Sequence, residues 1–300
     1  MWTDVHSSFS ALRPPDPSPR LTMNLLETVC ALTGAASARR RMRLQSLWRG
    51  YGEVVMVSLE GGPAPTVVVK HVRPPNSAHP RKLQSYIVET AWYAHARPTG
   101  PRIPLCHGAT TDGHERVVVL EDLHAAGFKR TLSANDPRQI VAALEWLAHL
   151  HATHLGPPPE HLWPVGTYWH LGTRTAELKA TPDPRWHTRA PKLDAALRGA
   201  RFQTVVHGDA KPANFLWSPQ NASVAAVDFQ YVGGGPGIRD VVYLLDTDDP
   251  GDTRLEPYFR ALRHALPPHV DAPALEQEWR ALVPVAAEDF ERFLAGWGRA

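Results

Sequence analysis

The chain has 300 residues, a formal net charge of +2 and 43% hydrophobic residues, which is enough for a sizeable core and excludes an intrinsically disordered chain. Its length allows two domains or lobes. The small net charge provides no strong field for nucleic acid or an anionic membrane, and no apolar run is long enough to span a bilayer. We therefore expect neither as a partner.

The amino-terminal segment lacks the basic start and apolar core of a secretory signal. Four prolines fall within six positions of residues 1–22, and we expect these residues to form a disordered tail. The two cysteines, Cys30 and Cys106, have no metal-binding or redox spacing. They are typical of buried thiols in a reducing compartment, so we expect a cytoplasmic protein.

A β-rich region follows a short expected helix from Asn24 to Gly34. Strand-like runs alternate with glycine turns and predict an antiparallel meander that includes one helix. The strands are expected at 41–48, 53–59, 66–72, 103–109 and 116–120, and the helix at 80–97 with Pro98 as its stop. A basic run in the first strand is expected to be a solvated surface rather than a phosphate grip: Arg39, Arg40, Arg41 and Arg43.

Beyond Leu123 the pattern becomes mostly helical. A helix is expected at 136–154, with Pro137 in its first turn. The remaining expected elements are helices at 173–179 and 191–198, short strands at 202–206 and 224–227, and helices from Ile238 onward. We therefore expect an α+β fold with a small lobe at 23–123 and a larger, mostly helical lobe at 124–300.

The strongest motif is an H-x-D-x-x-x-x-N pattern at His207–Asn214, followed by Asp228-Phe229. Phosphoryl transfer needs a carboxylate that accepts the proton of the attacking hydroxyl and oxygen ligands that hold Mg²⁺ on the phosphates. Asp209 suits the first task, and Asn214 and Asp228 suit the second. His207 is expected to brace the loop rather than to exchange protons.

Lysine is rare in this chain, with six among the 32 basic residues. Lys211, two residues after Asp209, can offset negative charge on a transferred phosphate. Lys70 lies in a β-branched run that resembles the V-A-I-K pattern, and Glu89 lies in the next helix. A Glu89–Lys70 pair would hold the ammonium toward nucleotide phosphates, which makes residues 23–123 the expected nucleotide-binding lobe.

Two further nucleotide contacts are expected in the small lobe. Gly50 and Gly52 in the first hairpin can cover the phosphates as an abbreviated glycine loop, or can be ordinary turn glycines. Where the last strand ends, the Glu121 carbonyl and the Leu123 N–H are candidates for hydrogen bonds to adenine.

The motifs at His207–Asn214 and Val227–Leu245 resemble those of the aminoglycoside phosphotransferase/choline kinase group. Gln230, where protein kinases have the glycine of D-F-G, is similar to the ecdysteroid-kinase-like branch. The resemblance covers about Leu44 to Leu245 and implies a protein-kinase-like two-lobed fold, with ATP and Mg²⁺ as cofactors. It implies Asp209 as catalytic base, Asn214 and Asp228 as metal ligands, and Lys70 as phosphate binder.

The length of the segment after Asp228 distinguishes a kinase that acts on small molecules from a protein kinase. Only eleven residues lie between Asp228 and Asp240, and no A-P-E follows, whereas protein kinases use this region as a peptide platform. We expect its four glycines to make a tight turn, and Asp240 to begin a helix and brace the catalytic loop. The expected activity is phosphorylation of a small hydroxyl compound; an aminoglycoside-type antibiotic kinase and a catalytically silent ligand-binding protein are the alternatives.

Other features remain open or favour packing. The aromatic residues Trp163, Tyr168 and Trp169 can bind the acceptor in the C-terminal lobe or fill its core equally well. This stretch supplies no carboxylates of the kind that an aminoglycoside would need. The histidines of the 136–154 helix favour packing over metal binding, because no third spaced ligand appears. The acidic run 246–252 is expected to be a solvated loop.

Overall fold

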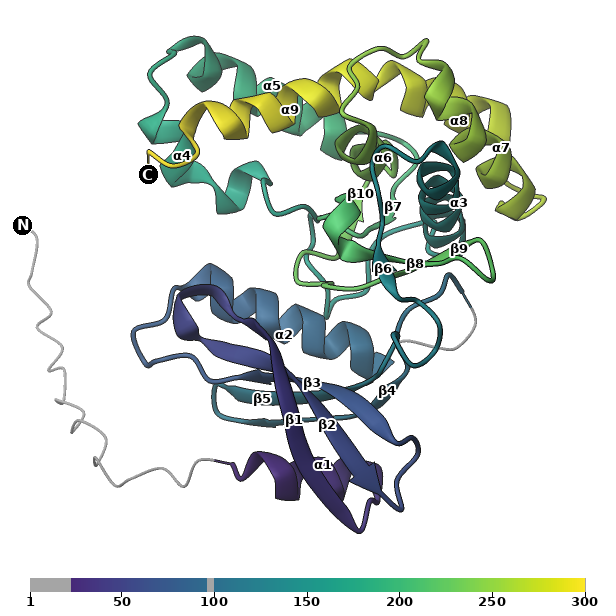
Figure 1. Cartoon of the computed structure of the whole chain (residues 1–300). Helices are drawn as coiled ribbons and strands as arrows, with labels where there is room; N and C mark the ends of the chain where they lie inside the picture. Colours follow the sequence, from purple (N-terminus) through teal and green to yellow (C-terminus); the bar gives the residue numbers. More distant parts are fainter. Residues whose placement is uncertain (1–22, 96–99, 300) are drawn as a thin grey trace, which may run out of the picture.

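The computed structural model describes residues 23–95 and 100–299, and its first half is built on one sheet (Figure 1). The strand order is β1-β2-β3-β5-β4, and every neighbouring pair is antiparallel. The elements of this part are β1 (Ser37–Ser46), β2 (Gly52–Glu60), β3 (Thr66–Val72), β4 (Cys106–Asp112), β5 (Glu115–Glu121), α1 (Leu25–Thr33) and α2 (Pro80–His95). The expected tail at 1–22 and the expected helix end at Pro98 lie outside the described residues.

The sheet presents two different faces, because successive side chains of a strand point in opposite directions. Val67 and Val69 of β3 pack in one apolar cluster with Val29 of α1. Lys70 points to the opposite face, where it meets Glu89 of α2. The alternation along β3 therefore places the lysine on the face that looks toward the rest of the chain.

The first strand, β1, is an exposed edge rich in arginine. It begins at Ser37 rather than at the expected Arg41, because its pairing with β2 continues to Glu60 across two irregular positions. Its arginines are exposed, as the sequence predicts. Charged side chains on an edge strand discourage pairing with other chains.

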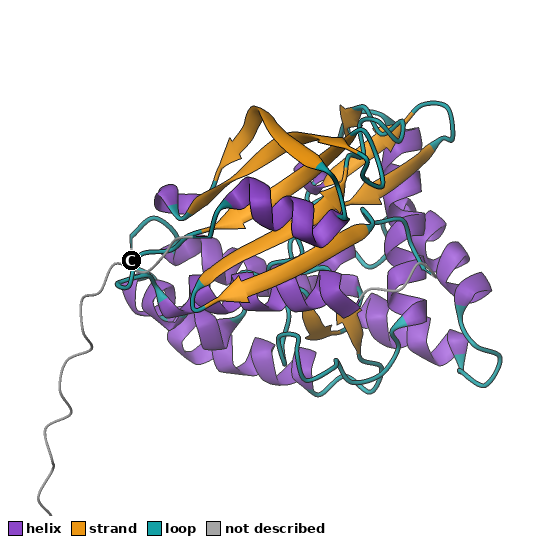
Figure 2. Ribbon diagram, turned by 90° about the horizontal axis from the view of Figure 1, so that it is seen from below, coloured by secondary structure: helices purple, strands orange, loops and turns teal. Residues whose placement is uncertain are grey.

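The second half of the chain is mostly helical and carries two small sheets. Its helices are α3 (Pro137–Thr153), α4 (Thr175–Ala180), α5 (Arg185–Arg198), α6 (Ile238–Leu245), α7 (Glu256–Ala265), α8 (Ala272–Ala281) and α9 (Val283–Gly296). One small sheet has the order β6-β8-β9 and the other pairs β10 with β7. The strands are β6 (Arg130–Thr131), β7 (Thr204–Val206), β8 (Phe215–Ser218), β9 (Ser223–Ala226) and β10 (Gly233–Gly235). Seen from below, the five-stranded sheet lies in front of the helical part (Figure 2).

Helix α5 begins six residues before the expected start, and Pro191 lies inside it. A proline removes a helical hydrogen bond and favours a helix start, which is why the sequence predicts one there. The apolar spacing of Trp186, Ala190, Leu193 and Leu197 continues through the proline, and all four side chains are buried. Packing of this face against the core outweighs the lost hydrogen bond.

The expected tight turn of glycines is wrong. Gly233–Gly235 form the extended strand β10, which pairs antiparallel with β7. A Cβ on Gly233 would lie 2.3 Å from the carbonyl oxygen of Trp163, so the neighbouring backbone leaves no space for a side chain. The glycines permit close strand packing next to the motif at His207–Asn214.

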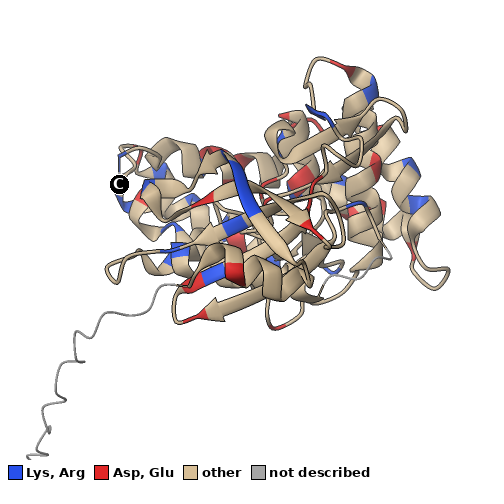
Figure 3. Cartoon of the chain, turned by 60° about the horizontal axis from the view of Figure 1, so that its bottom comes forward, with Lys and Arg blue, Asp and Glu red and all other residues tan. Residues whose placement is uncertain are grey.

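Basic and acidic residues are interspersed along the ribbon, in keeping with the small net charge (Figure 3). Among the described residues, no helix is both long and apolar enough to cross a membrane. The fold mixes an antiparallel sheet with a helical part, so the α+β expectation is confirmed. The lobe boundary near Leu123 remains a proposal.

Candidate functional site

The H-x-D-x-x-x-x-N motif occupies the loop between β7 and β8. Gly208 has φ +81°, and a Cβ there would lie 2.1 Å from the carbonyl oxygen of Tyr231. Only glycine meets both conditions, because other residues rarely adopt this φ and would clash with the backbone. The loop can therefore adopt this shape only with a glycine between His207 and Asp209.

Asp240 holds this loop from α6. It is fully buried, and its two carboxylate oxygens accept the backbone N–H groups of His207 at 2.6 Å and Gly208 at 3.0 Å. His151 of α3 lies 3.2 Å away through Nε2. The expected brace is present, although α6 begins two residues earlier, at Ile238. His151 serves packing and loop support, as the sequence favours.

His207 is fully buried, and both of its ring nitrogens have backbone partners. Nδ1 accepts the N–H of Asp209 at 3.3 Å, which places the ring proton on Nε2 facing the Val227 carbonyl oxygen at 3.1 Å. Phe229 packs on this ring, with centroids 4.7 Å apart, and stacks on Trp92 of α2 at 4.9 Å. His207 thus positions Asp209 and the Asp228 segment relative to α2.

The two oxygens of Asp209 differ in their surroundings. Oδ2 accepts hydrogen bonds from Lys211 Nζ at 2.8 Å and Asn214 Nδ2 at 3.0 Å. Oδ1 has one contact among the described residues, the hydroxyl of Tyr243 at 3.4 Å, which is long for a hydrogen bond. Burial raises the pKa of Asp209 above its usual value, although Lys211 acts in the opposite direction. This carboxylate has one firmly held oxygen and one oxygen open to a donor.

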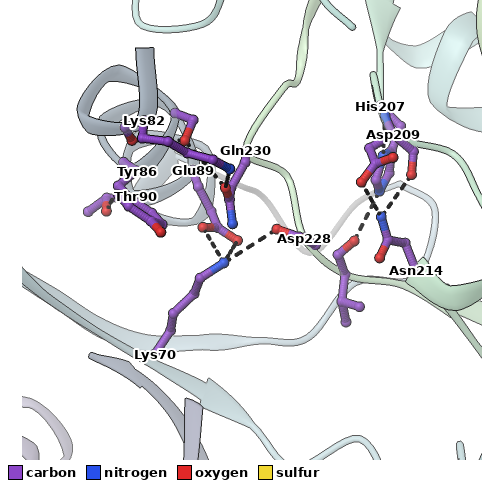
Figure 4. Close-up of polar contacts among 12 residues, drawn as sticks. Lys70, Lys82, Tyr86, Glu89, Thr90, His207, Asp209, Asn214, Asp228 and Gln230 are labelled. Atoms are coloured by element: carbon purple, nitrogen blue, oxygen red, sulfur yellow. Dashed lines mark hydrogen bonds and ion pairs between the residues drawn. The ribbon is translucent and has the colours of Figure 1, made fainter. Parts of the chain in front are cut away.

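Lys70 meets two carboxylates (Figure 4). Its Nζ lies 2.6 Å from Glu89 Oε2 and 3.3 Å from Asp228 Oδ1. Burial disfavours the charged ammonium, but Glu89 and Asp228 outweigh it and raise the pKa of Lys70. Burial also raises the pKa of Glu89 to about 7, against the lowering effect of Lys70. The structure brings together the expected Lys70–Glu89 pair and adds Asp228 to it.

Asn214 and Asp228 have oxygens suited to a magnesium ion. The Asn214 amide nitrogen donates to Asp209, and its side-chain oxygen has no hydrogen-bond partner in the described part of the chain. Asp228 adopts φ +67° and is 35% exposed at its side chain. Within residues 23–95 and 100–299, no group of three or more His, Cys, Asp or Glu side chains is suited to a metal. Two hard oxygen ligands fit Mg²⁺, which keeps waters and binds substrate phosphates.

The expected adenine contacts lie where β5 ends. Leu123 is buried, and its N–H has no hydrogen-bond partner among the described residues. Asp122 fixes the local backbone by accepting the N–H groups of His124 and Ala125. The Glu121 side chain is occupied by Arg102 Nη2 at 2.5 Å, so its backbone carbonyl remains the candidate contact.

The short glycine loop has a structural function as well as its proposed one. Gly52 has φ +139°, and a Cβ there would lie 2.0 Å from the His71 carbonyl oxygen, so it allows β2 and β3 to approach. Gly50 has φ +73° and open space around its Cβ position. Phosphate cover therefore remains a proposal for Gly50 and its neighbours.

The aromatic segment divides between the core and the site. Trp169 is 1% exposed and belongs to the interior. Tyr168 is half-buried, and its hydroxyl lies 3.3 Å from that of Tyr243, the residue at Asp209 Oδ1. Trp163 stacks on Tyr231, with centroids 6.3 Å apart. Sequence reasoning missed Tyr243 as a site residue, although it is in the Asp240–Leu245 motif.

Comparison with known proteins places these features in context. The protein-family model described as "Phosphotransferase enzyme family" matches residues 44–281. A putative fructosamine-3-kinase structure from Thermobifida fusca YX-ER1 has a TM-score of 0.50 at 16% identity, covering 91% of this chain and 98% of that chain. Comparison with curated protein sequences finds no match.

Two other solved structures are similar at lower scores. A choline/ethanolamine kinase family protein from Mesorhizobium loti gives a TM-score of 0.49 at 17% identity, with coverage of 90% and 96%. An aminoglycoside-3'-phosphotransferase of type VIII gives 0.47 at 16% identity, with coverage of 89% and 100%. The likeness to the fructosamine-3-kinase structure shows the fold alone, and it confirms the expected protein-kinase-like architecture.

Proposed function

The chain belongs to the phosphotransferase enzyme family, and on that premise we propose that it transfers the γ-phosphate of ATP to a hydroxyl of a small molecule. The observation that carries this proposal is the carboxylate of Asp209. Lys211 and Asn214 hold its Oδ2, while the contact of Oδ1 within the described part of the chain is a long one with Tyr243. A fixed carboxylate with one open oxygen suits a base that aligns an acceptor hydroxyl.

The proposed step follows from this geometry. The acceptor hydroxyl donates its proton to Asp209 Oδ1 as its oxygen forms a bond to the γ-phosphorus. The bond between that phosphorus and the bridging oxygen breaks, and its electron pair leaves with ADP. Burial raises the pKa of Asp209, which makes this carboxylate a better proton acceptor than an exposed aspartate.

The phosphates would meet cations from two sides of the site. Lys70, held by Glu89, is proposed to bind the α- and β-phosphates. Lys211, half-exposed and paired with Asp209, is proposed to offset charge on the transferred group. Asn214 and Asp228 would hold Mg²⁺, which supplies charge neutralisation on the phosphates. Gly50 and Gly52, and the backbone of Glu121 and Leu123, would contact the nucleotide phosphates and the adenine respectively.

The segment after Asp228 supports a small acceptor. It leads through buried β10 directly into α6, and residues 229–240 are buried or nearly so. A buried segment cannot serve as a peptide platform or a phosphorylated activation loop. Gln230 at the third position of D-F-Q supports the ecdysteroid-kinase-like branch as a finer proposal.

A turnover screen tests this function. Hydroxyl compounds of varied charge and size are incubated with Mg·ATP, and ADP release is measured for the wild type and for Asp209→Asn. We expect at least one compound to stimulate ADP release, with a loss of about 10³-fold in the variant. Compound-stimulated ADP release that Asp209→Asn retains would overturn the proposed role of this carboxylate. If no compound stimulates release, the proposed activity fails.

A further inference from the structure

Beyond the open oxygen of Asp209, the described residues form an aromatic surface. Tyr243 contacts that oxygen, and Tyr168 lies next to Tyr243. The ring centroid of Tyr168 is 6.0 Å from that of Tyr231, which in turn stacks on Trp163. An acceptor whose hydroxyl reaches Asp209 would therefore have aromatic rings along its carbon skeleton.

Lysine 82 lies at the far end of this surface, on the first turn of α2. Its Nζ is 5.4 Å from the Tyr231 ring and 5.9 Å from the Trp48 ring. Its hydrogen bond goes to Gln230 Oε1 at 3.3 Å (Figure 4). Within the described part of the chain it forms no ion pair with a carboxylate, whereas Lys70 pairs with two. Glu89 lies near enough for Lys82 to lower the pKa of that carboxyl, although the two form no ion pair. A half-buried ammonium with no directly paired carboxylate favours an anionic ligand.

Two arginines add to the positive charge beside Lys82. Arg81 donates to the Thr173 carbonyl oxygen at 2.7 Å and lies 3.7 Å from Glu177. Arg174 lies 2.7 Å from the same carboxylate, and its guanidinium is 5.8 Å from the Tyr168 ring. One carboxylate is thus shared by two arginines, and the Arg81 Nε is buried without a partner among the described residues.

The exposed His79 lies close to these arginines. Burial lowers the pKa of His79, and the adjacent cations Arg81 and Arg174 lower it further, with Glu177 acting in the opposite direction. Burial and Arg174 also lower the pKa of Arg81. Cations outnumber the available carboxylate at this end of the aromatic surface, which is unsuited to an aminoglycoside or any other polycationic acceptor.

We propose that the acceptor carries an acidic group in addition to its hydroxyl, and that Lys82 binds this group, with Arg81 adding positive charge beside it, while the half-buried Tyr168 packs against its carbon skeleton. The inference rests on the proposed phosphotransfer, because Asp209 marks where the hydroxyl must lie. An oxyanion would give Lys82 a directly paired charge, and charge-assisted hydrogen bonds would make this contact selective.

A matched set of compounds tests the charge preference. The set is 3-(hydroxymethyl)benzoate, 3-(hydroxymethyl)benzamide and 3-(aminomethyl)benzyl alcohol, which share one scaffold and differ in charge. Affinity is measured by titration calorimetry with Mg²⁺ and a non-hydrolysable ATP analogue, and kcat/KM is measured with ATP. We expect the carboxylate to exceed the amide by about 10-fold in both quantities, with the ammonium compound weakest.

Variants of Lys82 test whether this residue causes the preference for the carboxylate compound. Lys82→Met should reduce the carboxylate-to-amide ratio to about 2 or less, and Lys82→Arg should retain most of it. Lys192→Met, on the exposed face of α5, is the control and should leave the ratio unchanged. The KM for ATP should stay within about 2-fold in Lys82→Met, because Lys70 and not Lys82 is assigned to the nucleotide.

Several outcomes would overturn this inference. Equal affinity for the three compounds, including no measurable binding of any, contradicts it, as does a preference for the amide or the ammonium compound. A raised KM for ATP in Lys82→Met with an unchanged acceptor ranking would assign Lys82 to the nucleotide instead. Asp209-dependent turnover of a neutral or cationic acceptor would leave the proposed phosphotransfer intact while the charge inference fails.

Discussion

Lys70 on β3 and Lys82 on α2 lie on neighbouring elements, yet their surroundings are opposite. Lys70 is held by Glu89 and Asp228 at 2.6 and 3.3 Å, whereas the hydrogen bond of Lys82 within the described residues goes to the amide oxygen of Gln230. A lysine with two carboxylates is fixed in place before any ligand arrives, which suits phosphates of invariant geometry. A lysine with no directly paired carboxylate is available for a charge that the ligand brings.

Removal of Lys70 is expected to have the largest effect on activity. Lys70→Met takes away the proposed phosphate contact and leaves the buried Glu89 and the partly exposed Asp228 without this cation. We expect kcat/KM for ATP to fall by about 10²- to 10³-fold, while the ranking of acceptors by charge stays the same. Steady-state kinetics at varied ATP, with the three benzyl compounds as acceptors, measures both. A changed acceptor ranking would show that the two lysines act together.

Lowering the pH should reduce kcat/KM for ATP, because Glu89 becomes protonated and holds Lys70 less firmly. Burial raises the pKa of Glu89 to about 7, so this carboxylate takes up a proton as the pH falls through that value, and Lys70 then loses one of its two partners. We expect kcat/KM for ATP to fall by up to about 10-fold between pH 8 and pH 6. The pH profile of the free enzyme, read from kcat/KM, measures this.

The matched variant is Glu89→Gln, which cannot titrate. Its kcat/KM for ATP should be lower at pH 8 and nearly flat between pH 8 and pH 6. A fall of the same size in the variant would assign the titration to another group. The raised pKa of Asp209 predicts a second loss of activity at lower pH in both proteins, because a protonated Asp209 cannot accept the hydroxyl proton.

The smallest effect on kcat is expected for a change at Tyr243, which lies next to Asp209 on the side proposed to bind the acceptor. Its hydroxyl is 3.4 Å from Asp209 Oδ1, a long contact that an acceptor hydroxyl would replace. Tyr243→Phe keeps the ring against Tyr168 and Phe290. We therefore expect kcat to change by about 3-fold or less, measured with saturating acceptor. A loss near that of Asp209→Asn would mean that the tyrosine hydroxyl takes part in the proton transfer itself.

The sequence was informative where function depends on local spacing. The interval from His207 to Asn214 fixes the loop, because Gly208 must adopt φ +81° and Asp240 must reach its backbone. The alternation along β3 likewise determines the face that Lys70 occupies, and the helical register places Glu89 opposite it. These short-range constraints allowed the proposed nucleotide side to be predicted before the structure.

The acceptor side was not predictable in the same way. Lys82 and Tyr243 are far apart in the chain. Lys82 lies over Tyr231 and Tyr243 contacts Tyr168, so their placement depends on tertiary packing. Loop and surface side chains follow no fixed pattern, so no spacing signals them. The missed start of α5 has a related cause, because the packing of Trp186 and Ala190 outweighs the local preference of Pro191.

The most direct test of the account follows the phosphate itself. Wild-type protein and Asp209→Asn are each incubated with Mg²⁺, ATP labelled with ¹⁸O in the γ-phosphate and 3-(hydroxymethyl)benzoate, and the products are analysed by mass spectrometry. The account predicts a labelled phosphate ester on the benzylic oxygen with the wild type and its loss by about 10³-fold in the variant. Label found only in inorganic phosphate, or ester formed equally by both proteins, would contradict it.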